Sequence, residues 1–169
     1  GEPLGERKLW LQDDYVKFIR RAQHHVDLAG AGVVGYVTNH GWLDNPTFRG
    51  MRAALLRSFP TMCVLDLGGT ANRRAAGDEN VFGIRQGVAA VTLATHGDGR
   101  VRVGSSTGTV EHKRDALRGG LRTACVAVAA PATPRYELRV AARSDPGYRA
   151  FTPLTELFPV HTTGLVTAR

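Results

Sequence analysis

The chain of 169 residues has the length of one ordinary domain or of one half of a larger one. Hydrophobic residues make up 43% of it and charged residues 22%, which provides a core and excludes a wholly disordered chain. No run of about 18 apolar residues occurs, and the first residues lack the apolar stretch of a secretory signal. We therefore expect no membrane span and a cytoplasmic location.

The charge balance is basic, with 22 Lys and Arg residues against 15 Asp and Glu residues and a net charge of +7. Most of the basic residues are arginine, whose guanidinium forks onto phosphates and guanine edges, so the excess favours a polyanionic partner. A bias of composition toward Arg, Ala and Gly explains the same charge without a partner. Cys63 and Cys125 are too few for a disulfide scaffold and lie in apolar runs, so we interpret them as structural thiols.

The first predicted element is a helix. Asp13 and Asp14 offer a cap at its start, and it ends before Gly30. Its apolar residues recur at spacings of three and four: Tyr15, Phe18, Ile19, Ala22 and Val26. The next run, GVVGYVTN at 32–39, is too short for a helix and rich in β-branched residues, which predicts a buried strand.

An Asn-Pro pair at 45–46 places a cap residue before proline at the first helical position. This pair predicts a second helix, which runs to about Phe59. The apolar run at 61–69 predicts a second strand, and residues 70–80 form a polar loop without periodicity. The segment 81–97 contains a third strand.

A turn signal at 96–99 separates the third strand from the short apolar run 100–104. Strands that alternate with helices predict an α/β fold with an open, mostly parallel sheet and crossover helices. No helix separates the last two apolar runs, so we expect them to pair as an antiparallel edge hairpin. Beyond them the pattern weakens to a short helix within 111–121 and an extended piece with a turn at 134–148.

Four segments follow one another in the chain: DYVKFIRRAQ, GVVGYVTNHGWLDNPTFRGMRAALL, VLDLGG and DENVFGIRQGVAAVTL. In this order they resemble the second half of the catalytic domain of gamma-class DNA adenine-N6 methyltransferases. The likeness is greatest to the fused restriction-modification polypeptides of type ISP and related single-chain systems, and it covers about residues 10 to 95. Several motifs in the right order are stronger evidence than one.

The resemblance implies a partial Rossmann-like sheet that binds S-adenosyl-L-methionine, and an enzyme that flips adenine out of the duplex and methylates its amine. It places the C-terminal half of the catalytic domain at 1–103, a family-specific extension at 104–150 and a linker at 151–169. The implied partners are double-stranded DNA, the N-terminal half of the methyltransferase domain, and a target-recognition domain after the linker. The resemblance thus implies that this chain is a fragment of a longer protein. We expect that protein to be an adenine-specific DNA methyltransferase and this chain alone to be inactive.

Two family signatures are absent from this sequence: the FxGxG cofactor loop, and the NPP(Y/F) or DPP(Y/F) tetrapeptide that grips the amine. Asn45-Pro46-Thr47-Phe48 is similar to the tetrapeptide with one substitution. In the family, however, the tetrapeptide precedes the DYVKF-like helix, whereas this string follows it. We therefore interpret Asn45 as a helix cap, expect the tetrapeptide ahead of the first residue, and assign no catalytic residue to this chain.

Three residues match family positions that face the cofactor or the target base. The resemblance places Phe18 beside the adenine of the cofactor, where core packing is the alternative. It places Phe82 on the face of the flipped base, where anchoring of its loop by hydrophobic contact is the alternative. Asn39 lies at the carboxyl end of the predicted strand 32–39 and either offers its amide to a base edge or satisfies the turn.

Arg73, Arg74 and Arg85 flank the Phe82 segment and are candidates for contacts to DNA phosphates. For any one of these arginines, a solvated loop face is the simpler explanation. The six histidines show no metal-ligand spacing, so we predict no metal site.

Two other functions stay open at this point. The chain is alternatively a non-catalytic basic DNA-binding or scaffolding module, or an unrelated Rossmann-like domain. The family reading requires Phe82 to lie at an open cleft beside Asn39, and this requirement separates it from a chance likeness.

Overall fold

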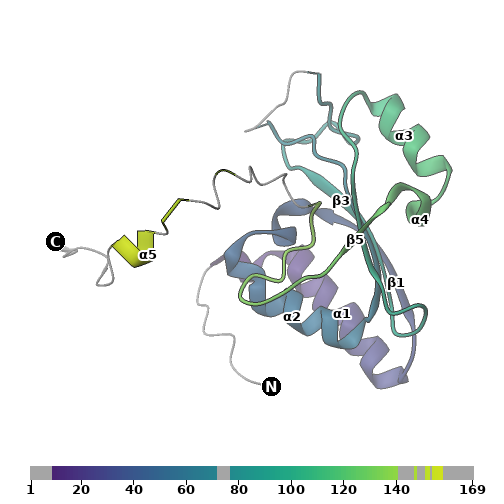
Figure 1. Ribbon diagram of the computed structural model, residues 1–169. Helices are drawn as coiled ribbons and strands as arrows, with labels where there is room; N and C mark the ends of the chain where they lie inside the picture. The colour runs from purple at the N-terminus through teal and green to yellow at the C-terminus, as the bar shows by residue number, and fades with distance from the viewer. Residues whose placement is uncertain (1–8, 72–76, 141–146, 148–150, 153, 158–169) are drawn as a thin grey trace.

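Five strands form one open mixed sheet in the order β1-β3-β2-β4-β5 (Figure 1). The computed structural model describes residues 9–71, 77–140, 147, 151–152 and 154–157. The α/β class expected from the sequence is confirmed. The strands are β1 (Val33–Asn39), β2 (Thr61–Asp66), β3 (Val88–Ala94), β4 (Val101–Ser105) and β5 (Ala127–Ala129).

The expectation of a mostly parallel sheet is wrong. β3 runs antiparallel to both β1 and β2, and β5 runs antiparallel to β4. Among the strands of the described residues, only β2 and β4 form a parallel pair. A strand that is apolar on both faces is best buried inside a sheet, and β3 lies between β1 and β2, with its residues buried or half-buried along its whole length.

The predicted edge hairpin between the third and fourth apolar runs is also wrong, because β2 lies between β3 and β4. The connection 95–100 passes around the start of β2 instead of closing a tight turn. The N–H of Gly99 donates to Thr61 Oγ1 at 3.0 Å, and the N–H of Met62 donates to the carbonyl of Arg100 at 3.0 Å. These bonds hold the connection against β2 and let β4 emerge on its far side.

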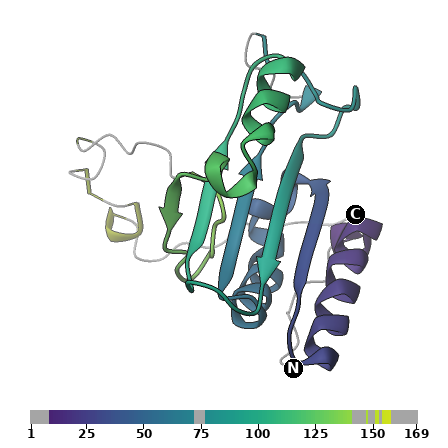
Figure 2. The same cartoon turned by 90° about the vertical axis from the view of Figure 1, so that its right-hand side faces the viewer.

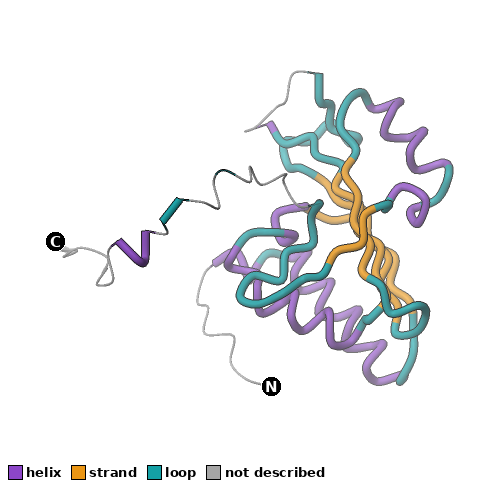
Figure 3. The backbone as a smooth tube through the Cα atoms, viewed as in Figure 1, coloured by secondary structure: helices purple, strands orange, loops and turns teal. Residues whose placement is uncertain are grey.

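Helices cover both faces of the sheet (Figures 2 and 3). On one face lie α1 (Asp14–Ala29) and α2 (Arg49–Ser58), and on the other lie α3 (Val110–Arg118) and α4 (Leu121–Ala124). The remaining helices are short: the 3-10 helices η1 (Leu9–Gln12), η2 (His40–Leu43) and η3 (Pro46–Phe48), and α5 (Leu154–Leu157). β4 spans the predicted domain boundary at residue 103, and β5 continues the same sheet.

The local signals at the helix ends match the structure. Gly30 takes a left-handed φ of 77° and ends α1, a conformation that glycine adopts without strain. Asn45 Oδ1 accepts the N–H of Thr47 at 2.9 Å and caps η3, which leads into α2. The interpretation of the Asn-Pro string as a helix start is therefore confirmed.

Two apolar cores separate the sheet from its helices. The larger lies under α1 and α2 and includes Ile19, Phe48, Leu55, Val64 and Val91. The smaller lies under α3 and α4 and includes Leu65, Leu67, Val88 and Cys125. Burial raises the pKa of the Cys125 thiol to about 12, so this cysteine stays protonated and packs as a small hydrophobe.

Arg52 of α2 is fully buried and joins this helix to the segment at 135–136. Its guanidinium donates to the carbonyls of Trp42 and Arg135 at 2.6 and 3.0 Å, and also to those of Asn45 and Tyr136. Burial lowers its pKa to about 10, so it remains charged at neutral pH. A buried charge that is bonded on every side fixes the segment around residues 135–138 against the core.

Candidate functional site

A pocket of about 570 Å³ lies where β1 ends and β3 begins. It is lined by the start of α1, the end of β1, and the loop that leads from β2 into β3. Figure 2 shows this loop, in teal, beyond the ends of the strands. The lining residues are Asp13, Tyr15, Val37, Thr38, Asn39, Phe82, Ile84, Gln86, Gly87 and Val88.

The structure brings two of the predicted site residues together in this pocket, Asn39 and Phe82. Phe18 lies on α1, one turn after the pocket-lining Tyr15, and its side chain is 59% exposed. Arg85 is exposed in the same loop as Phe82. Arg73 and Arg74 lie outside the described residues.

The backbone around Phe82 is held by Asn80, whose side chain is buried. Asn80 Oδ1 accepts the N–H groups of Phe82 at 2.9 Å and of Ile84 at 3.4 Å. Its Nδ2 donates to the carbonyls of Gln86 at 2.7 Å and Gly69 at 3.1 Å. The loop is thereby fixed on both sides of Phe82.

Asp78 anchors the same loop to α3. Its carboxylate accepts the N–H groups of Gly69 and Gly108 at 2.8 and 3.0 Å and pairs with Lys113 Nζ at 2.6 Å. Burial alone raises the pKa of this carboxyl, but the Lys113 ammonium and the two N–H groups outweigh burial and lower it. Glu79 adds a further bond, since its Oε2 accepts the N–H of Val110.

The apolar side chains that follow this polar network point into solvent. Phe82 is 61% exposed and Ile84 is 49% exposed, although the backbone N–H groups of both are bonded to the buried side chain of Asn80. A core residue would be covered, and a freely moving loop would not need buried anchors. The arrangement suits the presentation of an aromatic face to a ligand.

Polar groups line the opposite side of the pocket. Asn39 Oδ1 accepts the N–H of Gly41 at 2.7 Å, which satisfies the turn, and its Nδ2 donates to Gln86 Oε1 at 3.0 Å. Burial, together with the nearby Asp13 carboxylate, raises the pKa of Tyr15 to about 12. The Tyr15 hydroxyl therefore remains a hydrogen-bond donor at neutral pH.

Behind the pocket, His40 joins the ends of β1 and β2. Its Nδ1 lies 2.8 Å from Asp66 Oδ1, and Arg139 bridges Asp66 and Asp44 at 3.0 and 3.1 Å. Burial raises the pKa of Asp66, and the bond to His40, a backbone N–H and Arg139 lower it by more. The imidazole packs directly against Gly87, where a Cβ would come within 2.2 Å of His40 Nε2.

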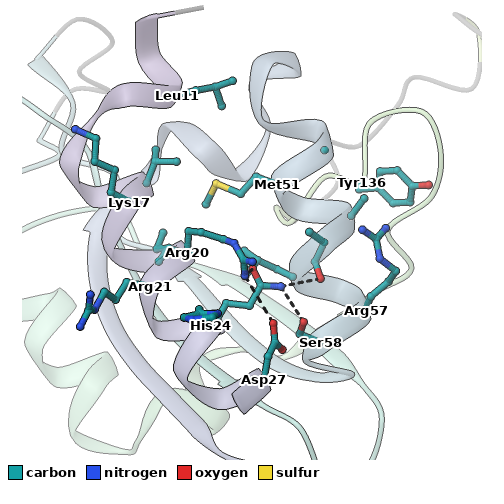
Figure 4. Close-up of a pocket in the computed structure, with 17 residues that line it drawn as sticks. Leu11, Lys17, Arg20, Arg21, His24, Asp27, Met51, Arg57, Ser58 and Tyr136 are labelled. Carbon is teal, nitrogen blue, oxygen red and sulfur yellow. Dashed lines mark hydrogen bonds and ion pairs between the residues drawn. The ribbon is translucent and has the colours of Figure 1, made fainter. Parts of the chain in front are cut away.

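A second and larger cavity, of about 1280 Å³, lies between α1 and α2 (Figure 4). Gln23 crosses its base and donates to Ser58 Oγ at 2.8 Å and to the Ala54 carbonyl at 3.3 Å. Its rim is basic, and one rim cation, Arg20, pairs with Asp27 at 3.7 Å. The basic rim residues are Lys17, Arg20, Arg21 and Arg57.

Within the described ranges, no three His, Cys, Asp or Glu side chains are grouped so as to hold a metal ion. No helix in that part of the chain is both long and apolar enough to cross a membrane.

Sequence reasoning missed the residues that build the loop. Asp78, Glu79 and Asn80 belong to the stretch that reads as polar loop, and Lys113 belongs to a predicted short helix. The signal available in the sequence is three polar residues directly before Val81 and Phe82. Their role depends on bonds to residues that are distant in sequence. Asp78 accepts the N–H groups of Gly69 and Gly108, and Glu79 accepts the N–H of Val110 in α3.

No protein-family model and no curated protein matches the chain. Solved structures do match it. In a cryo-electron-microscopy complex of DrdV with DNA, the similar part is 25% identical with a TM-score of 0.65, and it covers 76% of this chain and 13% of DrdV. The ATP-dependent Type ISP restriction-modification enzyme LlaBIII, bound to DNA, is 26% identical with a TM-score of 0.53 over 61% of this chain and 7% of that enzyme.

A nuclease-deletion mutant of the Type ISP restriction-modification enzyme LlaGI, in complex with a DNA substrate mimic, has the same fold over 89% of this chain. Its TM-score is 0.66, its identity is 22%, and the match covers 15% of that enzyme. The match thus covers 7 to 15% of the length of these three proteins. The expected likeness to type ISP restriction-modification enzymes is confirmed, whereas the assignment to their methyltransferase part stays a prediction.

Proposed function

We propose that this chain is part of a DNA adenine-N6 methyltransferase of a restriction-modification system, and that the pocket between Asn39 and Phe82 receives the flipped target adenine. The observation that carries the proposal is Phe82, an exposed aromatic side chain on a loop fixed by buried polar contacts. The similarity to restriction-modification enzymes in complex with DNA supports double-stranded DNA as the partner.

Phe82 would compensate the base for the stacking it loses outside the duplex. Stacking of a base on an aromatic side chain contributes about 1–3 kcal/mol. Ile84 and Val37 extend the apolar wall, while Asn39, Gln86 and Tyr15 supply polar groups at its edge. A nucleobase has an apolar planar face and a polar edge. It would therefore place its face against the apolar wall of the pocket and its edge toward the polar groups.

S-adenosyl-L-methionine, when bound, would supply the methyl group from its sulfonium. Phe18 fits a role beside the adenine of this cofactor, because its ring is exposed on the same helix as Tyr15 and one turn away from it. The chain's own contribution to the reaction is positioning, since adenine's amine is a weak nucleophile that must be held in line with the methyl group. The groups that grip this amine are expected in the preceding half of the domain.

That preceding half would pack along β1. β1 is the first strand in the sheet order, so its outer edge has no strand partner within the described residues. Val33 and Val37 in this strand are 68% and 52% exposed, and Leu28 at the end of α1 is 73% exposed. Apolar residues along an open strand edge suit continuation of the sheet by another segment.

The basic surface would meet the DNA backbone. Arg85 is exposed next to the pocket, and Arg73 and Arg74 precede the same loop in the sequence. Replacing a true phosphate contact such as Arg85 with Gln should weaken binding to all DNA sequences and lower the salt dependence by about one counterion.

The proposal is tested by methyl transfer to DNA with the full restriction-modification polypeptide that contains this chain. We expect Phe82→Ala to lower kcat/KM by about tenfold or more, the loss of one stacking contact. Val126→Ala, which removes an exposed apolar side chain that does not line the pocket, is the control. Unchanged methyl transfer by Phe82→Ala would contradict the proposal. A parent that binds DNA without methylating it would instead indicate the non-catalytic DNA-binding module.

A further inference from the structure

The side-chain amides of Asn39 and Gln86 meet in the wall of the pocket, and the backbone fixes their orientation. Asn39 Oδ1 accepts the N–H of Gly41 at 2.7 Å. Because an N–H group bonds only to an acceptor, this contact determines which end of the Asn39 amide is oxygen. The Asn39 Nδ2 group then donates to Gln86 Oε1 at 3.0 Å, so the atom of Gln86 that faces Asn39 must also be an oxygen.

This chain of contacts leaves Gln86 with a defined polarity. Its oxygen is occupied by Asn39, and within the described part of the chain its Nε2 group has no hydrogen-bond partner. Gln86 is exposed and lines the pocket together with Phe82. The hydroxyl of Thr38 is already used, because it donates to the Asn39 carbonyl and accepts from Trp42 Nε1. What Gln86 offers to a ligand is therefore a pair of N–H donors.

We propose that Gln86 is a specificity-determining residue, which donates from Nε2 to an unprotonated ring nitrogen of the base in the pocket. The inference rests on the proposed function, because it takes the flipped adenine as the ligand. Adenine has three such acceptors, N1, N3 and N7, and a base that lacks the contacted one leaves a donor unpaired. Gly41 sets this preference indirectly, since its N–H fixes Asn39 and Asn39 fixes Gln86.

The experiment measures the Kd of the full polypeptide for duplexes in which the target adenine is replaced by 1-deaza-, 3-deaza- or 7-deaza-adenine. We expect one of the three analogues to bind about three- to tenfold more weakly than adenine, the effect of one hydrogen bond. Gln86→Glu removes the donors and should abolish this difference. Gln12→Glu adds the same charge at an exposed residue that does not line the pocket and should preserve it.

A second variant tests the orientation without changing Gln86. In Asn39→Asp, one carboxylate oxygen still accepts from Gly41, and the other accepts from Gln86 Nε2 in place of donating to its oxygen. Gln86 would then present its oxygen to the ligand, so Asn39→Asp should also abolish the discrimination. Asp is as good a cap as Asn, so the turn should persist.

The failure of this inference differs from the failure of the proposed function. If Phe82→Ala leaves methyl transfer to DNA unchanged, the base pocket itself is overturned. If Phe82→Ala lowers methyl transfer but all three analogues bind as tightly as adenine, or if Gln86→Glu keeps the discrimination, only the role of Gln86 is overturned.

Discussion

Lys113 and Asp78 form a buried ion pair, with 2.6 Å between Nζ and Oδ1, that ties α3 to the loop carrying Phe82. The Lys113 side chain is fully buried and that of Asp78 is 8% exposed. Lys113 also donates to the carbonyl of Glu79, the next residue of the loop. One lysine thus holds both the side chain and the backbone of the segment that leads to Phe82.

Removal of the buried cation should destabilise the protein strongly. Lys113→Met keeps most of the side chain's volume but leaves the Asp78 carboxylate without its cation, which typically costs about 3–5 kcal/mol. Urea unfolding measures the loss. Arg118→Met is the matched control, because Arg118 pairs with Asp115 on the surface, and loss of such a pair costs about 0–1 kcal/mol. Equal effects of the two substitutions would contradict the structural role of Lys113.

The same pair should make stability depend on pH. The pKa of Asp78 is lowered from 3.8 in the folded chain, so the folded state binds fewer protons than the unfolded state at acid pH. The stabilisation is therefore complete above about pH 5 and is lost as the pH falls through the folded-state pKa. We expect the free energy of unfolding to fall less steeply below pH 4 in Lys113→Met than in the wild-type chain. Parallel pH profiles of the two proteins would show that Asp78 does not depend on Lys113.

Gly87 should tolerate no side chain, because the His40 imidazole packs against it. A Cβ there would come within 2.2 Å of Nε2, and Asp66 prevents the ring from moving away. We expect Gly87→Ala to lower the free energy of unfolding by about 1–3 kcal/mol, the usual effect of overpacking. Gly35→Ala in β1 is the control, since nothing lies within 4 Å of its Cβ position. A neutral Gly87→Ala would mean that His40 is free to move.

Phe82 should contribute little to stability. Its side chain is 61% exposed, so Phe82→Ala should change the free energy of unfolding by less than about 0.5 kcal/mol. Phe48→Ala is the comparison, because Phe48 is 2% exposed in the main core and its truncation should cost about 3–5 kcal/mol. A large destabilisation by Phe82→Ala would favour the alternative in which Phe82 anchors its loop.

The sequence predicted those features that depend on neighbouring residues. The apolar spacing from Tyr15 to Val26 predicts α1, and Asn45 with Pro46 predicts the helix start, because caps and periodicity act within a turn or two. The order of the strands depends on pairing between distant segments. β3 and β4 are adjacent in sequence with a turn signal between them. Local signals therefore predict a hairpin between them, although β2 pairs between them in the sheet.

The candidate site was predictable in part. A resemblance pointed to Phe82 and Asn39, and both line one pocket. The supports of that pocket could not be found in the same way, because a buried lysine and a buried asparagine look like surface residues in a sequence. Lys113 lies 35 residues after Asp78, and only the fold brings them within hydrogen-bond distance.

The contact between Phe82 and the target base is tested most directly by photocrosslinking. A duplex with 5-iodouracil in place of the target adenine is bound to the full polypeptide, irradiated, and digested for mass spectrometry. We expect the crosslinked peptide to contain Phe82, and we expect the crosslink to be lost in Phe82→Ala but kept in Val126→Ala. A crosslink that forms elsewhere in the protein with equal yield in Phe82→Ala would contradict the stacking of the base on this residue.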